Sequence, residues 1–164
     1  IKAKIETINL KKKFDIISAL FHILSYHTSK TQINNFFKKS HLHLNKNGIL
    51  IFDFWYKKGV FTLQTPLRVR EVNNNSYKII RVTISQWIKK MNQIFDKHNL
   101  TILNKKNKKI TNFSETHKMR YFEIEYIKKK LKEHNFKFLK SIDLQTGKNV
   151  SSKSWGALVV AKKI

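Results

Sequence analysis

The chain has 164 residues, enough for one domain with one core, and its 41% hydrophobic and 12% aromatic content excludes a disordered chain. It has no cysteine, which excludes disulfides and thiolate metal sites, and no apolar run approaches the roughly 20 residues that a membrane helix needs. We therefore expect a cytoplasmic protein with no membrane partner.

The formal net charge of +24 admits nucleic acid, an acidic surface or an anionic substrate as a partner. Lysines are spread along the whole chain, and only four of the basic residues are arginines: Arg68, Arg70, Arg81 and Arg120. We therefore favour a dispersed, solvated charge over a dedicated polyanion site. Weak, salt-sensitive binding to nucleic acid follows from either interpretation.

The first part of the chain predicts a strand, a helix and a second strand. Ile1–Leu10 is an edge strand or the approach to one, and the apolar run Phe14–Phe21 predicts a strand covered on both faces. Ser29–Gln32 fits a capping box before an amphipathic helix that ends near Asn45–Gly48. Because Ile49–Trp55 is again apolar, the two strands should pair in parallel through a right-handed crossover.

The middle of the chain, residues 66–121, changes to extended segments separated by polar turns. The residues of Tyr77–Ile88 alternate between apolar and polar side chains, as in a strand with two different faces. These features predict an inserted antiparallel meander, with strands over Arg68–Val72, Tyr77–Ile88, Asn92–Asp96, Leu100–Asn104 and Ile110–Arg120.

The end of the chain returns to a helix and two strands. A helix begins at Glu123 and carries Lys128–Lys132 toward its C-terminal half, an order that suits the helix dipole. The strands Phe136–Leu144 and Trp155–Ala161 follow, joined by a loop over Gln145–Ser154.

The order and spacing of these segments resemble class I S-adenosylmethionine-dependent methyltransferases. The family runs FDxIxxLFHxxSY and GGxxIFDxWY correspond to Phe14–Tyr26 and Gly48–Tyr56. The runs RYFxxxEIxxxLxxxxF and TGKxxSxxxWGxxVVAKK correspond to Arg120–Phe136 and Thr146–Lys163. Lys46–Gly48 departs from the usual Pro-Gly-Gly. The resemblance implies an α/β fold: a partial Rossmann-like methyltransferase sheet of parallel strands with crossover helices, an antiparallel last strand and the inserted antiparallel β-meander.

The glycine-rich cofactor loop of that family is not found in the sequence. The four glycines are too far apart to form a G-x-G turn, which needs glycine for close approach to a cofactor: Gly48, Gly59, Gly147 and Gly156. We therefore expect residues 1–164 to be a single truncated methyltransferase domain whose cofactor loop lies upstream of Ile1. A processed mature start is the alternative. Residues 66–121 are the expected substrate-covering region.

Two strand ends carry the candidate catalytic groups, because ligands bind at the carboxyl ends of strands in open α/β sheets. His22 can act as a base or bind a substrate hydroxyl, with a packed loop histidine as the equally weighted alternative. Asp53 can orient a nucleophile and Tyr56 can position a substrate, against the alternative of a carboxylate that caps a loop. The predicted catalytic residues are thus His22, Asp53 and Tyr56.

The resemblance also implies binding residues. The S-adenosylmethionine cofactor is expected to contact the loop after the first strand, at Leu20, Phe21, His22 and Tyr26. The expected substrate-binding residues are Trp55, Arg68, Arg70 and Arg120. No H-x-x-x-H or cysteine pattern exists, so we expect no metal site.

Together these expectations describe an enzyme that transfers a methyl group to a small molecule. A sugar or nucleotide-sugar is favoured, because an antiparallel cover resembles the sugar-modifying branch of the family. The alternative is a basic nucleic-acid-binding or RNA-methylating domain of the same fold. Lysines gathered on one surface together with Arg68 and Arg70 are the feature expected of that alternative.

Overall fold

In the computed structural model, residues 3–5 and 7–164 are described, and the chain divides into two compact units. The first unit consists of Ile1–Leu63 and Arg120–Ile164, and the second of Gln64–Met119. None of the helices in the described residues is both long and apolar enough to cross a membrane.

The first unit is built on a mixed sheet around a long central strand. Its strands, in spatial order, are β1 (Phe14–Ala19), β2 (Leu44–Tyr56), β8 (Gly156–Lys163) and β7 (Phe136–Asp143). β1 runs parallel to β2, whereas β8 runs antiparallel to both β2 and β7. The predicted parallel pairing of the first two strands and the antiparallel last strand are confirmed.

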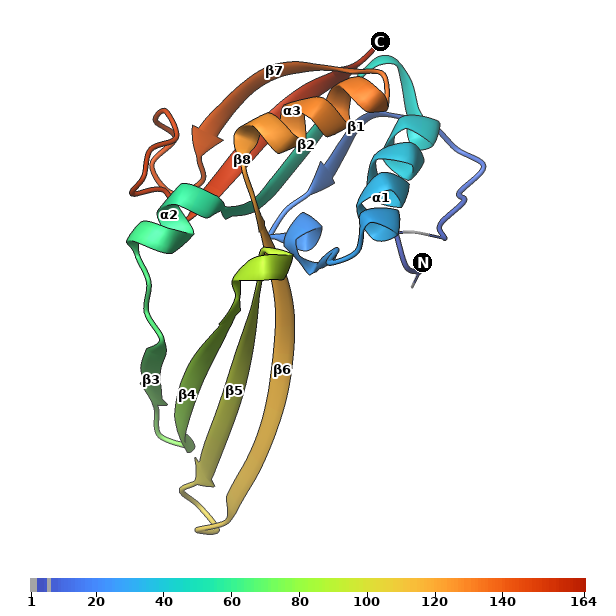
Figure 1. The fold of residues 1–164 in the computed structure, drawn as a ribbon. Coiled ribbons are helices and arrows are strands. Elements are labelled where there is room, and N and C mark those ends of the chain that lie inside the picture. Colours follow the sequence, from blue (N-terminus) through green and yellow to red (C-terminus); the bar gives the residue numbers. More distant parts are fainter. Residues whose placement is uncertain (1–2, 6) are drawn as a thin grey trace. The chain divides into compact units, whose positions relative to one another are not determined.

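Two helices cover one face of this sheet (Figure 1). They are α1 (Lys30–His43) and α3 (Ile124–Glu133), and the short elements η1 (Ile23–Tyr26) and α2 (Lys57–Thr62) follow β1 and β2. The predicted capping box is confirmed, since the Ser29 hydroxyl accepts from the Gln32 amide and the Gln32 side chain accepts from the Ser29 amide, both at 3.1 Å.

The core lies between these helices and β2. Phe36 and Phe37 of α1 meet Phe52 of β2 edge to face, with ring centroids 5.7 and 5.6 Å apart. Phe52 and Phe54 are fully buried and belong to this core. Because side chains alternate along a strand, Asp53 and Trp55 point to the opposite face of the sheet.

The expectation that the first strand is covered on both faces is wrong. Phe14 and Ile16 of β1 are 39% and 61% exposed, and β1 ends at Ala19 instead of Phe21. The reason is that β1 is an edge strand whose pairing, within the described residues, is with β2. Residues 3–5 and 7–10 contain no strand, and residues 1, 2 and 6 of the predicted first segment lie outside the described residues.

The first helix ends close to the predicted place, at His43, and Asn47 has a positive φ of 64°. Asn45–Gly48 is nevertheless no separate turn, since β2 starts at Leu44 and these residues form an irregularity between the pairs Phe14–Leu44 and Ile16–Ile49. A second predicted turn is wrong. The polar residues 97–99 do not separate two strands. They continue the pairing of one strand with its neighbour, because hydrogen bonds along the ladder outweigh the local turn preference of Lys, His and Asn.

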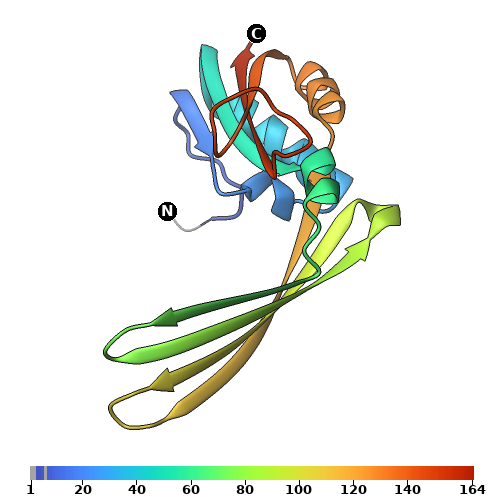
Figure 2. The same cartoon turned by 90° about the vertical axis from the view of Figure 1, so that its left-hand side faces the viewer.

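The second unit contains an antiparallel sheet without an α-helix (Figure 2). It consists of β3 (Leu67–Asn73), β4 (Tyr77–Ile88), the short η2 (Lys89–Met91), β5 (Gln93–Asn104) and most of β6 (Ile110–Phe122), in the spatial order β3-β4-β5-β6. β4 runs antiparallel to β3 and β5. That this sheet covers a substrate stays a prediction.

A close backbone contact holds α2 against the loop between β7 and β8. A Cβ atom on Gly59 would lie 1.7 Å from the Ser154 carbonyl oxygen. The adjacent Tyr56 amide donates to the Trp155 carbonyl at 2.9 Å. Glycine is therefore required at residue 59 by the approach of two backbones.

We predict that Gly59→Ala lowers the free energy of unfolding by more than the roughly 1–3 kcal/mol of ordinary overpacking, because the obstacle is backbone. Gly147→Ala is the matched control, since a Cβ there meets nothing within 4 Å and only its φ of +69° is unfavourable. Urea denaturation of both variants measures the difference. Equal losses would contradict the close contact.

Candidate active site

The centre of the site is a contact between His22 and Asp53. Asp53 lies on β2 with a fully buried side chain, and its two carboxylate oxygens accept from the His22 backbone amide at 3.0 and 3.1 Å. The His22 Nδ1 atom lies 2.8 Å from Asp53 Oδ2, a close contact between imidazole and carboxylate that lacks the direction of a good hydrogen bond. The carboxylate thus engages Nδ1, and Nε2 is the imidazole nitrogen that remains for other partners.

The loop that carries His22 has an unusual backbone. Phe21 and His22 both have positive φ angles, of 63° and 62°, although neither is glycine. Such residues are uncommon and concentrate at functional sites. Two hydrogen bonds hold the loop: the Ser25 amide donates to the His22 carbonyl, and the Ser25 hydroxyl accepts from the Trp55 amide, both at 2.9 Å.

The loop fills a gap beside β2. β1 pairs with β2 as far as Ala19 and Phe52, and β6 pairs with β2 in parallel from Tyr121 and Trp55 onward. Between these two pairings, the Ser25 hydroxyl accepts from the backbone amide of Trp55, and the His22 amide donates to the Asp53 side chain. The sequence-predicted residues His22 and Asp53 are therefore brought together at one edge of the sheet.

Aromatic residues surround the pair on the same side of β2. The Trp55 ring meets the His22 and Trp155 rings edge to face, with centroids 6.2 and 5.3 Å apart. Trp55 is only 8% exposed, so its predicted contact with a substrate has little ring surface to use and stays a prediction. Tyr56 alternates with Trp55 along β2 and belongs to the hydrophobic core on the other face of the sheet, so the structure does not bring it to the His22–Asp53 pair. Its predicted catalytic role stays a prediction. Burial, followed by the nearby Glu123, raises the pKa of Tyr56, so this phenol keeps its proton and can act as a donor.

The predicted cofactor residues form an exposed apolar loop. Leu20, Phe21 and Tyr26 are 38%, 88% and 47% exposed and lie just after the carboxyl end of β1. Exposed apolar side chains beside a buried polar pair can pack against a flat ring or an aliphatic chain. This is the kind of surface that a nucleoside with an amino-acid chain needs on one side.

Arg120 lies in the first unit, where it joins two segments. Its Nη1 donates to the Thr28 carbonyl at 3.0 Å, and its guanidinium carbon lies 5.6 Å from the Phe122 ring centre and 5.8 Å from that of Tyr126. These contacts anchor the segment before α1. A direct contact between Arg120 and a substrate stays a prediction.

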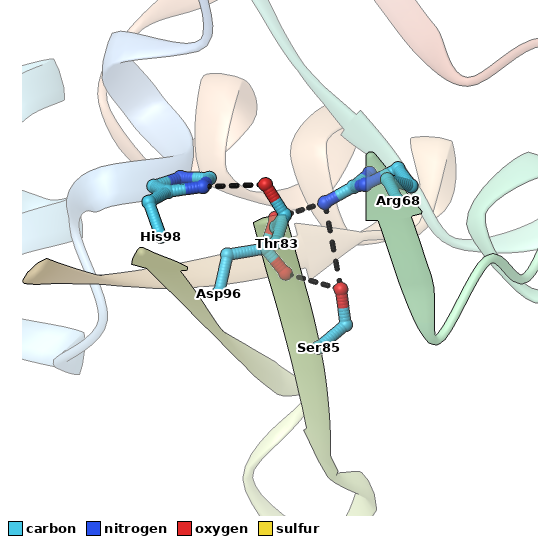
Figure 3. A network of polar contacts seen from close by, with 5 residues as sticks. All are labelled: Arg68, Thr83, Ser85, Asp96 and His98. Carbon is cyan, nitrogen blue, oxygen red and sulfur yellow. Dashed lines mark hydrogen bonds and ion pairs between the residues drawn. The ribbon is translucent and has the colours of Figure 1, made fainter. Parts of the chain in front are cut away.

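Arg68 and Arg70 belong to the second unit. Arg68 Nη2 pairs with Asp96 at 2.5 Å and donates to the Ser85 hydroxyl at 3.4 Å, while Ser85 donates to Asp96 at 2.6 Å (Figure 3). The charge of Arg68 is therefore compensated within the chain, and its predicted substrate contact stays a prediction. Arg70 carries no ion pair to a carboxylate among residues 3–5 and 7–164.

Two members of the site are not among the predicted site residues. Ser25 lies in the predicted loop after the first strand, but a single serine in a loop carries no periodic signal that would give it a role. Trp155 was assigned only to the last strand, and its contact with Trp55 depends on the pairing of β8 with β2. Within the described residues, His, Asp and Glu form no group of three or more that could hold a metal.

Comparison with known proteins places this geometry in a known fold. No family model matches the chain, and no curated protein matches it. Among solved structures, an S-adenosylmethionine-dependent methyltransferase from Clostridium acetobutylicum is 20% identical, with a TM-score of 0.80 over 98% of this chain and 63% of its own. The chain has the methyltransferase fold.

Two sugar-modifying enzymes are similar as well. CalS10, an amino pentose methyltransferase from Micromonospora echinaspora, gives a TM-score of 0.75 at 16% identity over 99% of this chain and 63% of its own. The sugar N-methyltransferase KedS8 from Streptoalloteichus gives a TM-score of 0.79 at 17% identity, over 98% of this chain and 60% of its own. This chain thus spans about 60–63% of the length of these structures.

We predict that Asp53→Asn lowers the free energy of unfolding by about 1–3 kcal/mol, because the His22 N–H is shared by both oxygens of a buried carboxylate, whereas asparagine is neutral and accepts at one atom only. Asp15→Asn is the control, since Asp15 is exposed and accepts from Asn45. Its effect should stay within about 0.5 kcal/mol. Chemical denaturation measures both, and an equally small effect of Asp53→Asn would contradict the role assigned to that carboxylate.

Asp143, at the start of the loop that carries Trp155, should make the free energy of unfolding depend on pH. The Ser154 hydroxyl, with the Thr146 and Gln145 amides, lowers the pKa of Asp143. The stabilisation by Asp143 is therefore complete above the unfolded-state pKa of about 3.9 and is lost as the pH falls through the lower folded-state pKa. Asp143→Asn should be less stable than the parent at pH 7. When the free energy of unfolding of both proteins is measured at decreasing pH, the difference between them should shrink. A gap that widens in acid would contradict this assignment.

Proposed function

We propose that the chain forms the acceptor side of an S-adenosylmethionine-dependent methyltransferase. The observation that carries the proposal is the pair His22–Asp53, held beside an exposed apolar loop at the carboxyl end of a parallel strand. Ligands bind at this edge in open α/β sheets. The likeness to methyltransferases of known structure supports the same chemistry.

The exposed loop fits one side of the cofactor. Leu20, Phe21 and Tyr26 provide apolar contact for the adenine and methionine parts, and His22 follows directly. When bound, S-adenosylmethionine supplies a methyl group on a positively charged sulfur. The chain contributes no G-x-G turn, so these residues cover only part of such a ligand.

His22 is the proposed general base. The acceptor nitrogen or oxygen would release one proton on methylation, and His22 Nε2 is the group placed to take that proton. Asp53 holds the imidazole through Nδ1 and stabilises the imidazolium that results.

A sugar, and in particular an amino sugar, is the proposed acceptor. The support is the similarity to CalS10, an amino pentose methyltransferase, and to the sugar N-methyltransferase KedS8. An amine suits a site with one general base, since a neutral amine attacks readily and loses one proton afterwards. A nucleotide carrier on that sugar belongs to the same proposal.

We predict that S-adenosylhomocysteine binds weakly to residues 1–164 and shifts the amide signals of residues 20–26 in a nitrogen-15 NMR titration. The affinity should be low because the chain has no glycine-rich loop. His22→Gln keeps this binding, whereas transfer of a tritiated methyl group to an amino sugar falls by about 10²–10⁴-fold, the usual contribution of a general base.

Two results would contradict the proposal. One is the absence of shifts at millimolar ligand, or shifts confined to other loops, which would exclude the cofactor contact. The other is a His22→Gln variant that transfers methyl groups at the parent rate, which would exclude His22 as the base. Phe21→Ala, which removes a side chain that is 88% exposed, tests the loop without disturbing the core.

A further inference from the structure

The arginines of this chain are not distributed like its lysines. Lysine and arginine together number 34, of which four are arginine. Three of these four lie in the second unit: Arg68, Arg70 and Arg81. Lysine carries its positive charge at a single ammonium group, whereas arginine has a planar fork that binds phosphate or carboxylate through two hydrogen bonds. A cluster of the rarer residue is therefore informative.

The pairing of β3 and β4 puts these arginines on one face. Arg70 is the direct cross-strand partner of Arg81, and Arg68 is the partner of Thr83. Partners in an antiparallel pair have Cβ atoms about 4.5–5.5 Å apart and lie on the same side of the sheet. Arg70 and Arg81 therefore place two positive charges opposite each other, which destabilises the pair in the absence of a counter-charge.

The acidic groups of this face are already engaged. Both oxygens of Asp96 are used, by Arg68 at 2.5 Å and by Ser85 at 2.6 Å (Figure 3). Glu115 pairs with His117 at 3.0 Å. Among the residues that the structure describes, neither Arg70 nor Arg81 forms an ion pair with a carboxylate.

Other groups on this face can assist an anion. The Thr83 hydroxyl and His98 Nδ1 lie 2.8 Å apart next to Arg81, and the His98 and His117 rings have centroids 4.8 Å apart. Burial and the nearby His117 lower the pKa of His98, while Asp96 acts against them and Arg81 adds to them.

We propose that Arg70 and Arg81 together bind a phosphoryl group of a small-molecule ligand. The two forks donate to non-bridging oxygens, and the anion removes the repulsion between them. We assign the phosphoryl group to a diphosphate-bearing small molecule, the chemistry that inorganic pyrophosphate and uridine diphosphate share. Arg68, fixed by Asp96, keeps β3 in register beside this site.

The test is calorimetric titration of the chain with inorganic pyrophosphate and with uridine diphosphate at constant ionic strength. Arg70→Lys and Arg81→Lys keep the charge but remove the fork, and each should weaken binding by about tenfold, as expected for one lost bidentate contact. Lys97→Gln is the control, because Lys97 is exposed and is the cross-strand partner of Ile84, on the other face of β4. It should change the affinity by less than about twofold.

Thermal unfolding gives a second readout. Without phosphate, Arg70→Thr should melt at the same temperature as the parent or above it, because the repulsion is gone and threonine suits a strand. Pyrophosphate should raise the melting temperature of the parent and leave that of Arg70→Thr unchanged. A pyrophosphate effect that Lys97→Gln reduces as much as Arg81→Lys would overturn the site, since binding would then follow net charge alone.

The same measurements separate this site from the methyl transfer chemistry. Loss of pyrophosphate binding in the arginine variants, with the residue 20–26 shifts from S-adenosylhomocysteine intact, supports two independent sites. Failure of S-adenosylhomocysteine binding with specific pyrophosphate binding rejects the proposed function but keeps the arginine pair. Binding of a single-stranded RNA that depends on Arg70 and Arg81, with no binding of uridine diphosphate, overturns the assignment to a small molecule.

Discussion

The buried carboxylate of Asp53 is the constraint on which the candidate active site depends. A charge removed from water must be matched by donors, and this one is matched by the His22 amide and approached by His22 Nδ1. Those contacts hold two successive non-glycine residues at positive φ, a conformation that the loop would not keep unaided. The same interaction therefore fixes the loop, orients the imidazole and places both at one sheet edge.

The central strand β2 explains why distant segments meet there. One edge of β2 pairs first with β1 and then with the end of β6, and its other edge pairs with β8. The turn after β1 occupies the interval between β1 and β6, where Ser25 accepts from the Trp55 amide. The pairing of Trp55 with Gly156 at the start of β8 brings the preceding Trp155 against Trp55. The turn after β1 and the residue before β8 thus meet at one site because β1 and β8 both pair with β2.

The second unit is organised by polar contacts as well as by its strands. Arg68, Ser85 and Asp96 come from three adjacent strands and satisfy one another, so the ion pair belongs to the architecture of the sheet. Arg70 and Arg81 have no such compensation within the described residues. A net charge of +24 cannot distinguish these two situations, since composition counts charges without placing them. The register of two strands makes the distinction.

Local patterns in the sequence were sufficient for the elements whose cause is local. The capping box at Ser29 and Gln32, the alternation along Tyr77–Ile88 and the parallel pair around one crossover follow from hydrogen bonds and periodicities within a few residues. The shared edge of His22 and Asp53 followed from that topology. The exposure of β1, the continuity of β5 through residues 97–99 and the Arg68–Asp96 pair were decided by the tertiary structure, because each depends on which strand lies alongside.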